Sequence, residues 1–177
     1  MPRHVEIKAR IPSVEALLPQ ARLLADDEHP QLIHQDDTFF AVPQGRLKLR
    51  VFGDGSGELI HDQQPDGDGP RPAEGRMAPV PEPESLREVL AGACGLLGRV
   101  RKERLLLLAG PVRIHLDRVA GLGDFVELQV SLADGQPEAA ASALADEVMQ
   151  RLGLAPAQRV RGSYLDLLRA AGGTAPA

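Results

Sequence analysis

The chain has a single cysteine, Cys94, among its 177 residues. One cysteine excludes an intrachain disulfide and a cysteine-based zinc site, and it fits a reducing compartment such as the cytoplasm. Aromatic residues are scarce, at 3% of the chain, and tryptophan is absent. No apolar run reaches about 18 residues, so we expect no membrane span. The N-terminus also lacks the apolar segment of a secretory signal.

An excess of positive charge is absent as well. The 25 acidic residues outnumber the 20 basic ones, which gives a formal net charge of -5 and a pI of about 5.5. A general nucleic-acid binder is usually basic, so we expect no nucleic-acid partner. Any anion site in this chain must therefore be a local concentration of cations rather than an effect of the whole surface.

What the chain does contain is repeated alternation of apolar and charged residues. In residues 4–10, His4, Glu6 and Lys8 would share one face of a strand, with Val5 and Ile7 on the other. The pattern predicts further strands at 32–42, 46–51, 57–63, 76–80, 98–109, 112–119 and 124–132. Helices are predicted at 14–25, 83–95 and 136–152, with a short last helix beginning near 163.

Hairpin-like turns join most of these strands, and strands do not alternate regularly with helices. This order predicts an antiparallel α+β fold. The length is that of one domain, which we place at 1–170, and we expect 171–177 to be a flexible tail. The loop at 64–75 is rich in proline and glycine, and loops of this length are often lids or disordered.

Two architectures fit strands that have one aliphatic and one charged face. The aliphatic faces could meet inside a sandwich, or they could face outward beneath the helices and leave a polar barrel interior. In the second case the interior holds seven cations and three acids. The cations are Lys8, Arg46, Lys48, Arg50, Lys102, Arg104 and Arg113, and the acids are Glu6, Asp117 and Glu127. Such a surplus favours a polyphosphate, with Mg²⁺ or Mn²⁺ bound by the acids.

Several segments, in this order and spacing, resemble the CYTH domain family, which includes class IV adenylyl cyclases and thiamine triphosphatases. They are residues 5–10, 35–40, 45–50, 100–104, 114–117, 121–128 and 163–164. The resemblance implies an eight-stranded antiparallel β-barrel, the triphosphate tunnel, with flanking helices. It also implies hydrolysis of inorganic or organic triphosphates, or formation of cyclic AMP from ATP.

Carried over by position, the resemblance assigns substrate binding to the seven cations above. It assigns metal binding to Glu6, Asp117 and Glu127, and catalysis to Lys8 and Glu6. Two acids of the family pattern are replaced in this chain, by His4 and by Gln129. We therefore expect weaker metal binding, or a shift towards Mn²⁺ or another transition metal.

We favour a triphosphatase over a cyclase, because the sequence shows no recognisable adenine pocket. A non-catalytic module that binds nucleotide or polyphosphate is the third alternative, supported by the two lost acids. The oligomeric state stays open, with a homodimer as one alternative.

Overall fold

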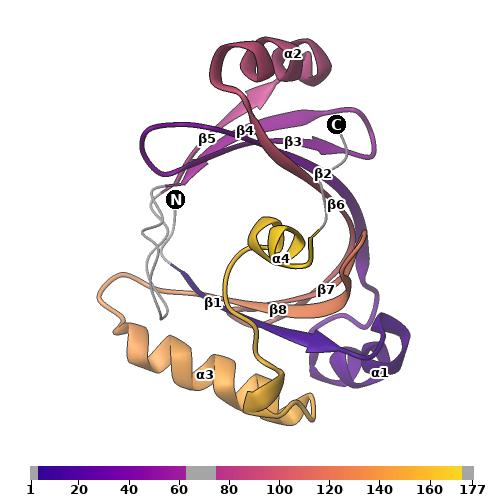
Figure 1. Cartoon of the computed structure of the whole chain (residues 1–177). Coiled ribbons are helices and arrows are strands. Elements are labelled where there is room, and N and C mark those ends of the chain that lie inside the picture. The colour runs from indigo at the N-terminus through magenta and orange to yellow at the C-terminus, as the bar shows by residue number, and fades with distance from the viewer. Residues whose placement is uncertain (1–3, 63–74, 173–177) are drawn as a thin grey trace.

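Eight strands form one antiparallel sheet in the computed structural model, which describes residues 4–62 and 75–172 (Figure 1). The strands are β1 His4–Ile11, β2 Gln31–Phe40, β3 Arg46–Phe52, β4 Gly57–Asp62, β5 Gly75–Val80, β6 Leu96–Ala109, β7 Val112–Val119 and β8 Gly123–Ser131. Their order across the sheet is β1-β8-β7-β6-β2-β3-β4-β5. The sheet curls into a barrel, and within the described residues no strand pairing closes it between β1 and β5. The predicted fold class is confirmed.

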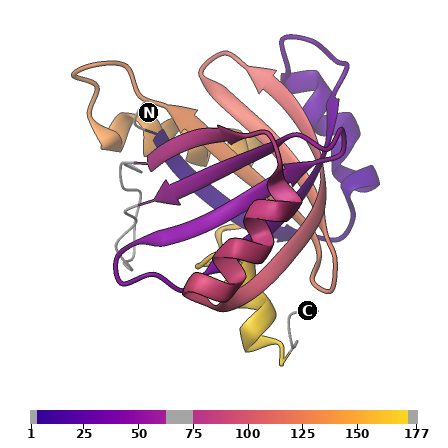
Figure 2. The ribbon, with the colours of Figure 1, turned by 90° about the horizontal axis from the view of Figure 1, so that it is seen from above.

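Four α-helices flank this sheet: α1 Val14–Leu24, α2 Pro83–Cys94, α3 Glu138–Arg151 and α4 Tyr164–Ala170. A 3-10 turn, η1 Pro156–Gln158, precedes α4. Helices α1 and α3 pack against the outside of β1, β6, β7 and β8, and α2 packs against β2 and β3. Seen along the barrel in Figure 1 and from above in Figure 2, α4 lies at one end of the barrel, within the ring of strands.

The larger hydrophobic core lies between the outer face of the sheet and helices α1 and α3. Val5 and Ala9 of β1, with Ile114 and Leu128, are completely buried there. Burying each large side chain contributes about 1.5–3 kcal/mol. The aliphatic faces of β1, β7 and β8 therefore point outward to these helices. Of the two architectures that the sequence allowed, this is the barrel.

Local signals set the ends of the elements. Ser13 caps α1, because its hydroxyl oxygen accepts a hydrogen bond from the Ala16 amide at 3.1 Å. Gly45 lies in the turn between β2 and β3 with a φ of 68°, and a Cβ there would collide with the carbonyl of Asp62. The strand predicted at 98–109 begins earlier, at Leu96, directly after Gly95 ends α2.

Two predictions fall mainly on residues that the structure leaves undescribed. The loop at 64–75 lies outside the described residues except for Gly75, and so do positions 173–177 of the expected tail. Among the described residues, the helices are all too short and too polar to cross a bilayer.

Candidate functional site

The strand register places the predicted site residues on the concave, inner face of the sheet. Lys8 pairs with Glu127, and Arg104 pairs with Asp117. Directly paired residues in an antiparallel sheet point to the same side, so these side chains share a face. The same reasoning extends along the ladder to Glu6, Arg46, Lys48, Arg50, Lys102 and Arg113.

The predicted residues differ in burial. Lys8, Lys102, Arg104, Asp117 and Glu127 are buried, whereas Arg113 is exposed. Charged side chains are seldom buried unless they are paired, so this inner wall must satisfy its own charges. Arg113 has no ion-pair partner among the described residues.

One half of the wall is organised by Arg104. Its guanidinium donates through Nε and Nη2 to the two oxygens of Asp117, at 2.7 and 2.6 Å, and again to Glu127 at 3.0 Å. The Tyr164 hydroxyl donates at 2.7 Å to Asp117 Oδ2, the oxygen that also accepts from Arg104 Nη2. His115 lies 3.2 Å from Glu127, and burial, followed by the charge of Arg104, lowers the pKa of its imidazole. Both Asp117 oxygens are therefore already engaged.

The other half of the wall is organised by Asp37, which the sequence analysis did not single out. Asp37 is 2% exposed and accepts two hydrogen bonds of 2.7 Å from Arg50, while Lys102 Nζ lies 3.4 Å away. Although burial opposes it, the charges of Lys102 and Arg50 hold the pKa of Asp37 well below its usual range. Burial in turn lowers the pKa of Lys102 to about 8.

Further acids on β4 correct the predicted charge surplus. In the strand register Glu58 stands opposite Arg50, and Asp62 stands opposite Arg46, so both acids face inward. With Asp37, they bring the inner acids to six against the seven predicted cations. The same register turns Arg10 inward opposite Phe125, so the surplus of four expected from the sequence is a surplus of two on the strands. The ion pairs of Lys48 and Arg46 are looser than that of Arg50, since Lys48 lies 3.6 Å from Asp62, and Arg46 lies 3.6 Å from Asp166.

Glu6 and Glu127 form a pair of carboxyl groups on adjacent strands. The charge of Glu127, followed by burial, raises the pKa of Glu6 to about 7. Against the effect of burial, Arg104 and Lys8 hold the pKa of Glu127 well below its usual range. The Glu6 side chain is nevertheless 39% exposed, so water reaches it inside the barrel. At neutral pH this pair shares a negative charge that a cation would stabilise.

The donor set fits one divalent cation better than two. Glu6 and Glu127 supply oxygens, Gln129 stands opposite Glu6 in the register, and His4 Nε2 lies 3.9 Å from Glu6. Hard cations prefer such oxygen ligands. Asp117 is committed to Arg104 and Tyr164. Within residues 4–62 and 75–172, no cluster of three or more His, Cys, Asp or Glu side chains is already arranged around a metal position.

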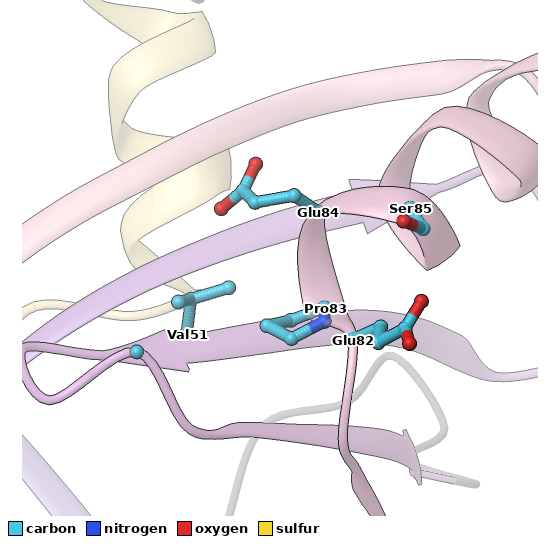
Figure 3. A pocket seen from close by; sticks show the side chains of 6 residues that line it. Val51, Glu82, Pro83, Glu84 and Ser85 are labelled. Atoms are coloured by element: carbon cyan, nitrogen blue, oxygen red, sulfur yellow. The ribbon is translucent and has the colours of Figure 1, made fainter.

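Two shallow hollows lie elsewhere, on the outside of the barrel beside α2. Figure 3 shows the smaller, of about 220 Å³, whose lining includes Val51, Pro83 and the acidic residues Glu82 and Glu84. The other hollow is lined by Val80, Pro81, Glu82, Ser85, Leu86 and Val89. Neither is lined by a basic side chain, so neither suits a phosphate. The inner face is the better candidate for an anion site.

The family resemblance is confirmed, because residues 2–164 match the CYTH domain. Solved structures share the fold. A conserved hypothetical protein of Pyrococcus furiosus is 24% identical with a TM-score of 0.80, and the match covers 93% of this chain and 99% of that one. A candidate adenylate cyclase of Vibrio parahaemolyticus is 20% identical with a TM-score of 0.76, covering 95% and 98%.

A third solved structure is described as a candidate adenylyl cyclase from Hippeastrum with a dominant triphosphatase activity. It is 16% identical with a TM-score of 0.69, and the match covers 99% of this chain and 98% of that one. No curated protein matches the chain.

Proposed function

This chain belongs to the CYTH domain family, and from that premise we propose that it is a metal-dependent phosphohydrolase that binds a triphosphate-containing small molecule, inorganic or organic. The observation that carries the proposal is the convergence of long cationic side chains on one concave face. Lys8 comes from β1, Arg50 from β3, and Lys102 with Arg104 from β6. Lysine and arginine are the residues that bind phosphate oxygens most strongly.

The wall carboxylates serve chiefly to orient these cations. Asp37 fixes the Arg50 guanidinium, and Asp117 fixes that of Arg104. A guanidinium held from one side keeps its remaining N–H groups in a fixed direction, which reduces the entropy lost on binding an anion. Phosphoryl transfer depends mainly on such positioning and on stabilisation of charge.

A divalent cation would be held by Glu6 and Glu127, and Gln129 and His4 would be its nearest additional donors. When bound, Mg²⁺ or Mn²⁺ supplies neutralisation of phosphate charge and activation of water. In this proposal Asp117 acts through Arg104 rather than as a direct ligand.

Lys8 binds phosphate in this proposal rather than acting as the base. Its ammonium lies 3.4 Å from Glu127 and donates to the Gly162 carbonyl at 3.3 Å. Both contacts orient the ammonium on the wall, as a phosphate-binding group requires. Cyclisation of ATP also needs an adenine pocket, for which the sequence shows no signature, so it is the less favoured reaction.

A binding module without turnover is the second candidate, favoured by the replacement of two family acids by His4 and Gln129. The deciding experiment measures phosphate release from inorganic triphosphate with Mg²⁺ or Mn²⁺, and assays ATP in parallel for both phosphate and cyclic AMP. Glu127→Gln removes an inner carboxylate, and Glu103→Gln is its control, because Glu103 is exposed on the outer face.

We expect metal-dependent phosphate release that Glu127→Gln abolishes and Glu103→Gln leaves intact. Formation of cyclic AMP in place of phosphate release would assign the chain to the cyclases. Tight triphosphate binding without any turnover would favour the binding module. Absence of both binding and turnover would rule out the inner face as a triphosphate site.

A further inference from the structure

Tyr164 lies inside the barrel against the cationic inner face, although it is far from the cationic strands in sequence. It is the first residue of α4 and is 6% exposed. Its hydroxyl donates to Asp117 at 2.7 Å, and its ring forms an edge-to-face contact with the Phe125 ring at a centroid distance of 5.1 Å and an interplanar angle of 63°. These contacts fix both the position and the tilt of the ring.

Two lysine ammonium groups lie against this one ring. Lys8 Nζ is 4.4 Å from the ring centroid and Lys102 Nζ is 5.3 Å from it. The lysines come from β1 and β6, which are separated in the sheet by β8 and β7. Both side chains are more than nine-tenths buried. Tyr164 is therefore the point at which cations from two separate parts of the wall are brought together.

The chemistry of an aromatic face suits this task. The negative face of the ring attracts an ammonium group but accepts its N–H groups only weakly. A carboxylate in the same place would neutralise each lysine and compete with a phosphate for those N–H groups. The ring thus offsets part of the repulsion between two buried cations without occupying any N–H group beyond those already directed at Glu127, Gly162 and Asp37.

Helix α4 is tied to the site at its first turn. The Ser163 hydroxyl accepts from the Asp166 amide at 3.2 Å, and the Asp166 carboxylate accepts from the Ser163 amide at 2.8 Å. Asp166 also lies 3.6 Å from Arg46 of β3. Behind Tyr164, Leu165 is 4% exposed within an apolar cluster that includes Phe125. The ring is held firmly enough to position other groups.

We infer that Tyr164 is a positioning residue whose aromatic ring holds the ammonium groups of Lys8 and Lys102 together for a single anionic ligand. This inference rests on the proposed function, which makes that ligand a triphosphate. It assigns separate roles to two parts of one side chain. The hydroxyl serves the Asp117–Arg104 network, and the ring serves the lysines.

Three variants separate those roles. Tyr164→Phe keeps the ring and removes the hydroxyl, and Tyr164→Leu removes both. Leu165→Ala is the control, because it weakens the packing of α4 without touching either lysine. Binding of inorganic triphosphate in the presence of Mn²⁺ is measured by calorimetry, and the NMR shifts of the lysine ε-methylene protons report the ring directly, without any ligand.

We expect upfield ring-current shifts for Lys8 and Lys102 in the wild type and in Tyr164→Phe, and their loss in Tyr164→Leu. Two cation–π contacts predict triphosphate binding about tenfold weaker in Tyr164→Leu, with Tyr164→Phe and Leu165→Ala within about threefold of the wild type. Equal losses in Tyr164→Leu and Leu165→Ala would reduce Tyr164 to a packing residue. A loss in Tyr164→Phe as large as that in Tyr164→Leu would assign the effect to the hydroxyl.

The NMR measurement keeps this inference distinct from the proposed function. Wild-type protein that shows both ring-current shifts but does not bind inorganic triphosphate would overturn the proposed function. It would still support the placement of both lysines against the Tyr164 ring. Wild-type protein that binds triphosphate without the shifts would overturn the inference about Tyr164 alone.

Discussion

At the scale of single residues, two adjacent aspartates show how the face of a strand determines what a charge contributes to stability. Asp37 is 2% exposed and faces Arg50 and Lys102 inside the barrel. Asp36 faces outward, where its 25% exposed side chain pairs with Arg99. Removing one member of a buried ion pair leaves an uncompensated charge, whereas surface pairs are screened by water.

We therefore predict that Asp37→Asn lowers the free energy of unfolding by about 3–5 kcal/mol, because Arg50 and Lys102 lose their shared counter-charge. Asp36→Asn should cost about 1 kcal/mol or less. Urea denaturation of both variants tests the difference. Equal costs for the two variants would contradict the assignment of Asp37 to the inner wall.

Glu6 gives a prediction about pH. Its pKa is raised from 4.5 to about 7 in the folded protein, so between these values the folded state binds more protons than the unfolded state. Stability should therefore fall as the pH rises through this window. Glu6→Gln removes the loss and should be about 1 kcal/mol more stable than the wild type near pH 8, a figure discounted for solvent screening.

The difference between wild type and Glu6→Gln should vanish near pH 4.5, the usual pKa of a free glutamate. Denaturation curves across the pH range, without added metal, provide the measurement. Glu28→Gln, at an exposed loop position, is the control. A wild-type protein that is as stable as Glu6→Gln at every pH would remove the case for a strained carboxyl pair.

At the scale of elements, the sequence predicted most strands because helices cover one face of the sheet and leave a strict period of two. It placed Lys8 and Glu127 correctly on the inner face for this reason. It did not single out Asp37, because four consecutive residues of β2, from Asp37 to Phe40, are all buried, and the alternation disappears. A local sequence pattern could not predict that Tyr164 reaches the lysines, because the path of α4 into the barrel is set by tertiary structure.

Two serine caps allow a test of what α4 contributes. Ser163→Ala and Ser13→Ala each remove an N-cap, at a cost of about 1 kcal/mol. Only Ser163→Ala should speed hydrogen exchange in α4 and weaken triphosphate binding, because its helix carries Tyr164 against the lysines. Ser13→Ala should affect stability alone, since α1 packs on the outer face. Equal triphosphate binding by the two variants would show that the site does not depend on the first turn of α4.

At the scale of the whole molecule, the charges of the barrel explain why a metal is expected with the anion. The chain carries a net charge of -5, and the inner face is nearly balanced, because its strands carry six acids against the seven predicted cations and Arg10. The sequence predicted the cations but undercounted the acids, because the register that turns Glu58 and Asp62 inward is set only by strand pairing. A triphosphate entering alone would place its charge beside the Glu6–Glu127 pair.

Metal and triphosphate should therefore bind cooperatively. A divalent cation on the carboxyl pair removes the repulsion, and by thermodynamic linkage each ligand must then strengthen the other by the same factor. We predict that inorganic triphosphate lowers the Kd for Mn²⁺ by about tenfold, after correction for the complex that the two form in solution. Glu127→Gln should abolish this coupling, and Glu103→Gln should preserve it. Titration calorimetry with each ligand, in the presence and absence of the other, measures this coupling. Independent binding of the two ligands would mean that the six inner acids serve only to hold the cations of the wall.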